Sequence, residues 1–85
     1  MIYPVYCVRD VKVGFQPQML VEQNDASAIR GFSYAVNNEG LMNYSPSDFD
    51  LYRIGRFDTD KGIFEAVTVP ELVASGASVF GDKKE

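Results

Sequence analysis

The sequence has no histidine and no tryptophan, and it contains a single cysteine. Without histidine the chain cannot form a Ser–His or Cys–His nucleophile pair or a histidine metal site. The one thiol, Cys7, has no second cysteine to pair with, which is typical of proteins from a reducing compartment. Cys7 also lies among apolar residues, which favours a small buried side chain over a reactive thiolate.

Basic residues are scarce and long apolar runs are absent. The 8 lysine and arginine residues face 12 aspartate and glutamate residues, so the net charge is −4. This balance opposes tight nonspecific binding to a polyanion, although it still allows a local basic patch. No apolar run approaches the roughly 20 residues of a membrane span, and no signal-peptide pattern opens the chain. We therefore expect no membrane association and a cytoplasmic location.

The composition that is present is that of a small folded domain. Hydrophobic residues make up 46% of the 85 residues, charged residues 24% and aromatic residues 13%. These values are typical of a globular protein, and the length allows one hydrophobic core. We expect one domain over residues 1–80 and a frayed tail over residues 81–85.

Two strands are predicted before the first helix. Met1 to Val8 is rich in β-branched and aromatic residues. Because Pro4 cannot donate a hydrogen bond, this strand should lie at a sheet edge or begin after Pro4. Arg9 to Gly14 is turn-like, and Gln18 to Glu22 reads as a second strand. The two strands should form an antiparallel hairpin.

A long helix is predicted to begin at Asn24 or Asp25, since both residue types are good N-caps. Its apolar stripe recurs at helical spacing and is formed by Ile29, Phe32 and Val36, flanked by Ala28 and Ala35. Its solvent side is predicted to carry Arg30, Ser33 and Asn37. Gly40 is a plausible C-terminal stop.

The second half of the chain favours a hairpin of two strands. Tyr44 to Asp48 is a turn, in which Ser45 and Pro46 can open one short helical turn. Phe49 to Phe57 has apolar residues on both faces, which is typical of a central strand. Within it, Gly55 marks a bulge or the close approach of another backbone.

Asp58 to Gly62 has hairpin chemistry, and Ile63 to Val69 is the return strand. Pro70 can start a short helix through Ala74. The sequence therefore predicts an α+β fold with ββαββ order: a four-stranded, mainly antiparallel sheet, one long helix on one face and a short C-terminal helix. The other face should carry Leu51 and Phe57, covered by the C-terminal helix or by a second subunit, and we expect a homodimer.

No motif for catalysis, a metal or a cofactor emerges. Asp58, Asp60 and Gly62 give the start of a calcium loop, but Ile63 and Val69 stand where that loop needs glycine and glutamate. Acidic residues that could pair for acid–base chemistry are more often solvated turn residues; they are Asp48, Asp50, Asp58 and Asp60. The glycines form no phosphate-binding cluster. We therefore expect a protein that is not an enzyme and needs no metal or cofactor.

Aromatic and basic residues on predicted strands are the main candidate for a binding site. Single-stranded nucleic acid is held by bases stacking on aromatic rings while cations follow the backbone. The candidate residues are Tyr6, Arg9, Tyr52, Arg53 and Arg56. Arg53 and Arg56 point to opposite faces of a regular strand, and only a bulge at Gly55 would bring them together. Core packing with solvated charges is the alternative interpretation.

Three motifs in order resemble the small nonstructural protein of gokushoviruses, single-stranded DNA phages of the Microviridae. The first motif is V-Y-x-V, the second A-I-R-x-F-x-x-x-V-N, and the third Y/F-x-L-Y/F-x-I-G-x-F-D. In this sequence the matching residues are Val5, Tyr6 and Val8; Ala28, Ile29, Arg30, Phe32, Val36 and Asn37; Phe49, Leu51, Tyr52, Ile54, Gly55, Phe57 and Asp58. A turn with Ser45, Pro46 and Asp48 precedes the third motif, as in that family.

The resemblance implies a nonstructural phage protein that is absent from the virion and is DNA-binding or replication-linked. Its implied role is to help the switch from duplex replication to synthesis and packaging of the single-stranded genome, in the cytoplasm of an infected bacterium. It would bind single-stranded DNA or a replication protein such as the phage replication initiator. The alternative is a small homodimeric interaction module that acts on a phage or host factor without DNA contact.

Overall fold

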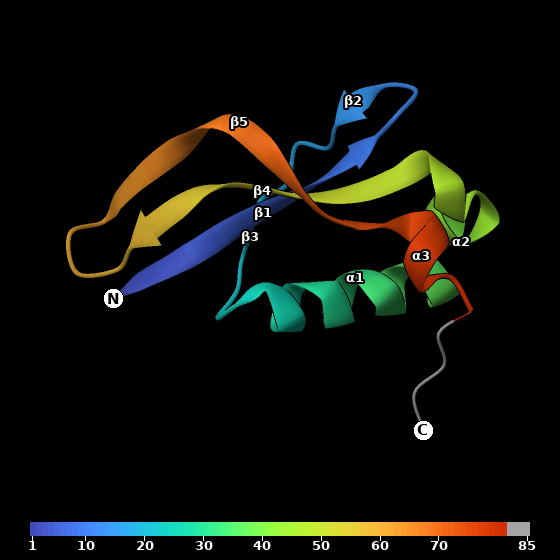
Figure 1. Ribbon diagram of the computed structural model, residues 1–85, viewed down its shortest axis with the longest axis horizontal. Helices are drawn as coiled ribbons and strands as arrows, with labels where there is room; N and C mark the ends of the chain where they lie inside the picture. Colours follow the sequence, from blue (N-terminus) through green and yellow to red (C-terminus); the bar gives the residue numbers. More distant parts are fainter. Residues whose placement is uncertain (82–85) are drawn as a thin grey trace.

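The computed structural model describes residues 1–81 as one curled antiparallel sheet with helices gathered mainly on one side (Figure 1). The sheet order is β2-β1-β4-β5, and β3 pairs with the same side of β1 as β2. The predicted α+β fold with a mainly antiparallel sheet, one long helix and a short C-terminal helix is confirmed. The elements are β1 (Ile2–Asp10), β2 (Gly14–Phe15), β3 (Leu20–Val21), α1 (Asp25–Asn38), α2 (Gly40–Tyr44), the 3-10 turn η1 (Pro46–Asp48), β4 (Phe49–Asp58), β5 (Ile63–Ser75) and α3 (Gly76–Val79).

The predicted second strand is shorter than expected, and a further two-residue strand precedes it. The sheet includes Gly14–Phe15 and Leu20–Val21 in place of the expected Gln18 to Glu22. The turn expected over Arg9 to Gly14 is therefore shorter, because β1 continues to Asp10. Pro17, which lacks a backbone N–H, lies between the two short strands and explains the interruption.

Pro4 lies inside β1, and β1 is an inner strand, so the prediction of an edge strand or a later start was wrong. The Pro4 carbonyl accepts a hydrogen bond from the Glu22 N–H at 3.2 Å, on the side of β1 where β3 pairs. The N and the C=O of one strand residue point to the same side, so the missing donor faces the two-residue strand β3 and not β4. Proline is tolerated because pairing on that side is brief.

Helix α1 begins where its capping residue predicts. The Asn24 side chain accepts a hydrogen bond from the Ser27 N–H at 2.9 Å. The helix ends at Asn38, and Gly40 has a positive φ of 43°, consistent with its predicted role as a stop. Asn37 does not simply face solvent as predicted: its amide donates to the carbonyl of Val79 at 3.0 Å and so connects α1 to α3.

The core lies between α1 and the face of the sheet turned toward it. Its centre is formed by fully buried side chains of three elements, Tyr6, Val36, Phe49 and Leu51. The helix contributes Ala28, Phe32 and Val36, with Ile29 partly buried beside them, which confirms the predicted stripe. Val79 of α3 closes one end.

A bulge in β4 changes which face its residues occupy. Tyr6 pairs with Arg53 and Val5 pairs with Gly55, so Ile54 is an additional residue between two paired positions. This confirms the bulge predicted at Gly55. Side chains along a strand alternate between the two faces of the sheet, and an inserted residue shifts this alternation by one. Residues of β4 after Ile54 therefore point to the face opposite to the one expected from counting along the strand.

This shift in alternation corrects the expectation that Leu51 and Phe57 share an uncovered face. Leu51 pairs with Val8, which is in the core, and Leu51 is itself fully buried under α1. Phe57 pairs with Tyr3, which lies on the opposite face from Tyr6. Of the two residues, Phe57 alone is on the face away from α1.

Gly55 is also a site of close backbone approach, as predicted. A Cβ atom added at Gly55 would lie 2.5 Å from the Glu65 carbonyl oxygen and 2.6 Å from the Phe64 ring. The Phe64 ring therefore lies against the glycine, which is how aromatic side chains commonly cover a glycine in a sheet.

The C-terminal part of the hairpin differs from its prediction. The turn forms at Asp58 to Gly62 as expected, and Gly62 has a φ of 70°. However, β5 extends to Ser75, so the helix expected from Pro70 to Ala74 is wrong and the short helix is α3. Ala66 and Glu71 both pair with β4, but residues 67–70 between them do not. Pro70 lies in this unpaired stretch, where a backbone N–H is not required for pairing with β4.

Of the predicted tail, Gly81 is the only described residue. Its N–H donates to the Asn37 side chain at 2.6 Å. Residues 82–85 of the predicted tail lie outside the described residues.

Candidate functional site

The most connected polar group on the sheet is a cluster of four residues from four elements, called here the Arg53 cluster: Tyr6, Asp25, Arg53 and Glu71. The Arg53 guanidinium donates through Nη1 to both Asp25 carboxylate oxygens, at 2.8 and 3.0 Å, and through Nε to Glu71 at 3.0 Å. The Tyr6 hydroxyl donates to Asp25 Oδ1. The cluster therefore joins the start of α1 to β1, β4 and β5.

Three residues of the Arg53 cluster have pKa values that their neighbours shift. The hydrogen bond from Tyr6, followed by the Arg53 guanidinium, lowers the pKa of the Asp25 carboxyl. Burial, followed by the Asp25 carboxylate, raises the pKa of the Tyr6 phenol. The Asp25 carboxylate also raises the pKa of Arg53. At neutral pH Tyr6 is therefore a neutral phenol, Asp25 a carboxylate and Arg53 a guanidinium, an arrangement that fits structural support and not proton transfer.

The Arg53 cluster predicts an acid-sensitive fold. Asp25 has a lowered pKa in the folded chain, so its contribution is present above the ordinary aspartate pKa of about 3.9 and is lost as pH falls through the folded value. Asp25→Asn should flatten the dependence of the free energy of unfolding on pH below about pH 4. Asp50→Asn is the control, since the Asp50 carboxylate makes no hydrogen bond within residues 1–81. Equal pH profiles for the two variants, from urea titrations, would contradict this role.

The five residues predicted to bind nucleic acid do not form one surface. Tyr6 is fully buried and cannot stack on a base. Arg53 shares the α1 side of the sheet with Tyr6, and the bulge brings Arg56 to that side as well, because Arg56 pairs with Pro4. Arg9 and Tyr52 pair with Asp50 and Cys7 on the opposite face.

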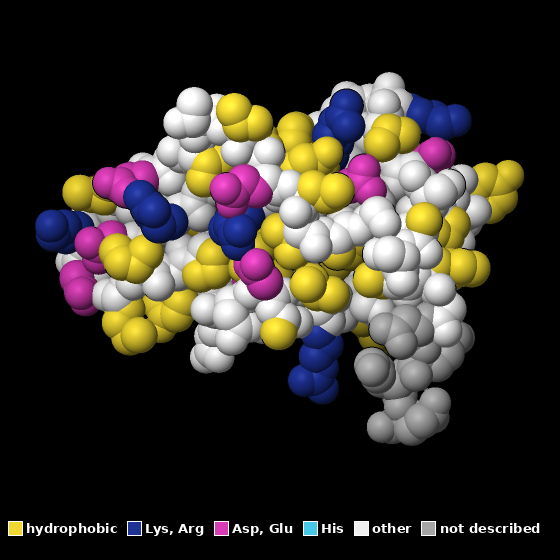
Figure 2. All heavy atoms as spheres, viewed as in Figure 1, with side chains coloured by type: hydrophobic (Ala, Val, Ile, Leu, Met, Phe, Trp, Pro, Cys, Tyr) yellow, Lys and Arg dark blue, Asp and Glu magenta, His cyan; other side chains and the backbone are white. Residues whose placement is uncertain are grey.

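The arginines of β4 are engaged with carboxylates. Arg53 is bound within its cluster, and Arg56 forms an ion pair with Glu65 at 3.0 Å. Lys12 lies 3.8 Å from Asp48. Figure 2 shows acidic and basic side chains beside one another on this face, without a separate basic patch. Both arginines at the centre of the predicted DNA surface are therefore already bound to carboxylates of the same chain.

The face of the sheet away from α1, called here the open face, carries a cross-strand row of aromatic rings. Tyr3 pairs with Phe57, and Phe57 pairs with Phe64, on three neighbouring strands. This aromatic row lies on the arm, the part of the sheet formed by residues 2–5, 55–58 and 63–66. Figure 1 shows the arm extending past the first turn of α1. Phe64 is 42% exposed, and Tyr3 and Phe57 are half-buried, so a partner would reach the row mainly through Phe64.

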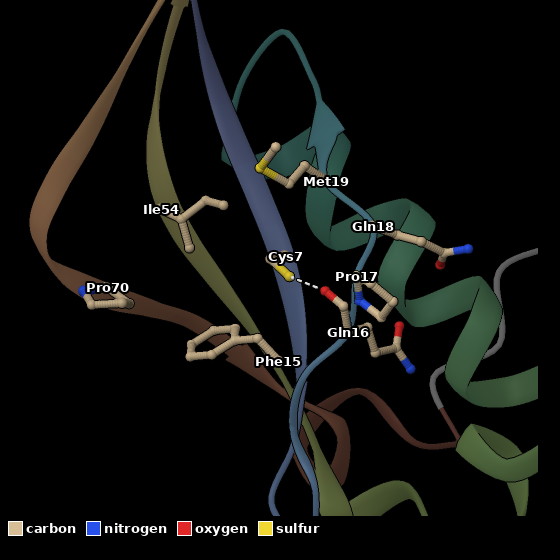
Figure 3. Close-up of a pocket in the computed structure, with 8 residues that line it drawn as sticks. All are labelled: Cys7, Phe15, Gln16, Pro17, Gln18, Met19, Ile54 and Pro70. Carbon is tan, nitrogen blue, oxygen red and sulfur yellow. Dashed lines mark hydrogen bonds between the residues drawn. The ribbon is translucent and has the colours of Figure 1, made fainter.

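Beside the arm, the open face contains an apolar hollow of about 460 Å³ (Figure 3). It is lined by Cys7, Phe15, Gln16, Pro17, Gln18, Met19, Ile54 and Pro70. None of these residues is charged. The Phe15 ring also meets the Tyr52 ring edge to face, with centroids 5.3 Å apart. The hollow is therefore a second apolar region of the open face.

Cys7 is a buried side chain, as predicted. Its thiol donates to the Gln16 carbonyl at 3.1 Å, and burial raises its pKa. A thiol held in this way is poorly suited to act as a nucleophile.

The acidic residues considered for catalysis do not come together. Asp48 and Asp50 lie at the start of β4, whereas Asp58 and Asp60 lie at its far end. Asp58 Oδ1 accepts hydrogen bonds from the N–H groups of Asp60 and Lys61, which confirms the hairpin-turn interpretation. Across residues 1–81, no group of three or more potential metal ligands is found. In the same range, no helix is long and apolar enough to cross a membrane.

The sequence reasoning missed Tyr3 and Phe64 as candidates. A signal for one of them was present, because the predicted hairpin at Asp58 to Gly62 places Phe57 near Phe64. No signal in the sequence indicated Tyr3, because its position beside Phe57 depends on the bulge in β4.

Residues 3–79 match the family described as phage ORF5 protein, so most of the chain is covered and the chain belongs to this family. No curated protein and no solved structure matches the chain. The protein is therefore a phage protein, and the matched range includes both the Arg53 cluster and the open face.

Proposed function

We propose that this phage protein is a nonenzymatic regulator of single-stranded DNA synthesis and packaging that acts by binding a replication protein. The partner expected from the resemblance to gokushovirus proteins is the phage replication initiator, in the cytoplasm of the infected bacterium. The observation that carries the proposal is the aromatic row on an accessible and uncharged part of the open face.

The arm has the composition of a protein-binding surface. Pairing places six residues on its open face, and none of them is charged. Val5 and Gly55 are buried beneath their neighbours, and the residues that reach the surface are Tyr3, Phe57, Phe64 and Ala66. Aromatic residues are enriched and most charged residues are depleted at the centres of protein interfaces. A row of three rings on neighbouring strands also offers a rigid contact surface, which fits the anchor residues that dominate binding energy.

The charges of the chain favour a protein partner over DNA. The net charge is −4, and both arginines of β4 are held by carboxylates of the same chain. Binding of DNA draws much of its affinity from cations that displace counterions from phosphates. An acidic surface with paired arginines supplies few such cations.

Direct binding of single-stranded DNA is a second candidate, favoured by the aromatic row itself. Stacking of a base on an aromatic ring contributes about 1–3 kcal/mol. Arg9 and Tyr52 are the predicted DNA-binding residues that lie on the open face, and they are the ones to test. With so few cations, affinity should be no better than about micromolar near physiological salt.

Fluorescence anisotropy with a labelled single-stranded 20-mer separates the two candidates. We expect no binding at about 100 micromolar protein. Arg56→Ala should leave any binding unchanged, because its guanidinium is already paired with Glu65. Binding that weakens steeply with salt and is lost in Arg9→Ala with Tyr52→Ala would instead support direct DNA contact.

The protein-binding proposal is tested by co-expressing the tagged chain with the phage replication initiator. The wild-type chain should retain the initiator during purification, and Tyr3→Ala with Phe57→Ala should lose it. Tyr34→Ala is the matched control, because Tyr34 is an exposed aromatic residue of α1, 63% accessible. Circular dichroism establishes that each variant is folded. Failure of the wild-type chain to retain the initiator, or equal retention by all variants, would overturn the proposal.

A further inference from the structure

The hollow of the open face lies next to an exposed apolar segment of β5 in the same chain. Residues 67–70, called here the β5 arch, run between two paired parts of β5 without pairing to β4. Figure 1 shows β5 rising over the side of the sheet away from α1. We propose that two copies of the chain form a two-fold symmetric dimer in which the β5 arch of each copy fills the hollow of the other. This inference is independent of the proposed function.

The hollow is suited to an apolar and uncharged occupant. Its volume is about 460 Å³, and no lining residue carries a charge. Two of its walls are exposed hydrophobic side chains, Phe15 at 44% and Met19 at 61% (Figure 3). Apolar side chains exposed together in this way are typical of the surfaces that contact sites use.

The β5 arch has the matching chemistry. Its residues, Val67, Thr68, Val69 and Pro70, carry no charge, and Val69 is 69% exposed. Pro70 belongs to the arch and also lines the hollow, so the two features adjoin. In a two-fold symmetric dimer both copies use the same patch. That patch must therefore contain both a projecting part and the hollow that receives it, and each contact occurs twice. The arch and the hollow meet this requirement within one molecule.

The charges around the arch also allow two acidic copies to approach. Glu65 and Glu71 flank the arch, and each is already paired with an arginine of its own chain, Arg56 and Arg53. Neither carboxylate is therefore bare. Glu65 is balanced by Arg56, whereas Arg53 is shared between Glu71 and Asp25, so the flank at Glu71 keeps one net negative charge. Like charges facing each other would otherwise oppose association.

The area that a stable dimer buries shows which further residues the interface must include. A stable dimer removes about 800 Å² from each partner, roughly one seventh of the 5662 Å² surface of this chain. Arch and hollow alone are small, so the interface should include the exposed Leu72 side chain, which follows the arch on the edge strand β5.

Light scattering and sedimentation of the full chain test the dimer. At about 100 micromolar the wild-type chain should have twice the mass of one chain, with monomer appearing on dilution. Val69→Asp should weaken the dimer at least about tenfold, since it moves a carboxylate into an apolar hollow. Met19→Lys should have a similar effect from the other side of the contact. Tyr34→Asp, on α1, should leave the mass unchanged.

A compensating pair tests the reciprocal geometry. The double variant Val69→Asp with Met19→Lys should recover the dimer, because each arch then carries a carboxylate facing a lysine of the other copy. Melting curves establish that each single variant is folded. A monomeric wild-type chain, dimeric single variants, or a double variant that stays monomeric while folded would each overturn the inference. Retention of the replication initiator can fail or succeed regardless of these results, because the aromatic row lies outside the arch and hollow.

Discussion

Replacing Phe32 with alanine is expected to lower the free energy of unfolding by about 3–5 kcal/mol. Phe32 is 4% exposed and lies at the centre of the α1 stripe, in the same core as Tyr6 and Leu51. Removing the ring leaves a cavity that the sheet, fixed by its hydrogen bonds, fills only in part. A small domain has a total stability of only about 5–15 kcal/mol, so this loss would remove a large fraction of it.

Thermal unfolding followed by circular dichroism measures the effect. A loss of 3–5 kcal/mol corresponds to a drop in melting temperature of more than about 12 °C for a domain of this length. Tyr34→Ala is the control on the exposed side of the same helix and should change stability by less than about 0.5 kcal/mol. Similar melting temperatures for the two variants would show that the buried face of α1 is wrongly assigned.

The helix could be predicted well because its signals are local. Residue type alone predicts a cap at Asn24 or Asp25, and in the structure Asn24 is the cap, with the Ser27 N–H as its partner. The stripe around Phe32 and Val36 follows from the helical repeat, which does not depend on the rest of the chain. The exception is Asn37, whose contact with Val79 joins segments 42 positions apart and leaves no local trace.

The faces of β4 could be predicted only in part. Gly55 indicated a bulge, but the sequence did not settle whether the bulge formed. Its consequence is large: one inserted residue, Ile54, brings Arg53 and Arg56 to the same face and separates Leu51 from Phe57. Any surface assembled by counting along this strand therefore changes with a single backbone feature.

The predicted binding site failed to assemble for a related reason. Tyr6 and Arg53 have the residue types of a nucleic-acid surface, yet their polar atoms are directed at Asp25 of α1. A tyrosine and an arginine that support the start of a helix cannot be distinguished by type from ones that bind a ligand. The aromatic row is the opposite case: its residues form a surface that residue type did not indicate. Strand pairing alone brings together Tyr3, Phe57 and Phe64.

The junction of α3 with η1 gives the second large expected effect, through Gly76. A Cβ atom added at Gly76 would lie 2.0 Å from the Pro46 carbonyl oxygen and 2.8 Å from the Phe49 carbonyl oxygen. Both obstacles are backbone atoms, one in η1 and one in the first residue of β4, so neither can rotate away as a side chain can. Gly76→Ala should therefore destabilise the fold by about 3 kcal/mol, at the upper end of the usual cost of overpacking.

A matched glycine makes the Gly76 result interpretable. Gly31 is exposed on α1, and a Cβ atom added there meets nothing within 4 Å. Gly31→Ala should therefore stabilise the protein by up to about 1 kcal/mol, because alanine favours the helix. The same substitution thus has opposite signs at two sites, measured by urea unfolding. If α3 moves away from η1 in the Gly76→Ala variant, Val79 leaves the core and its carbonyl loses the Asn37 amide. Equal stability of Gly76→Ala and the wild-type chain would mean that α3 does not pack against the η1 backbone.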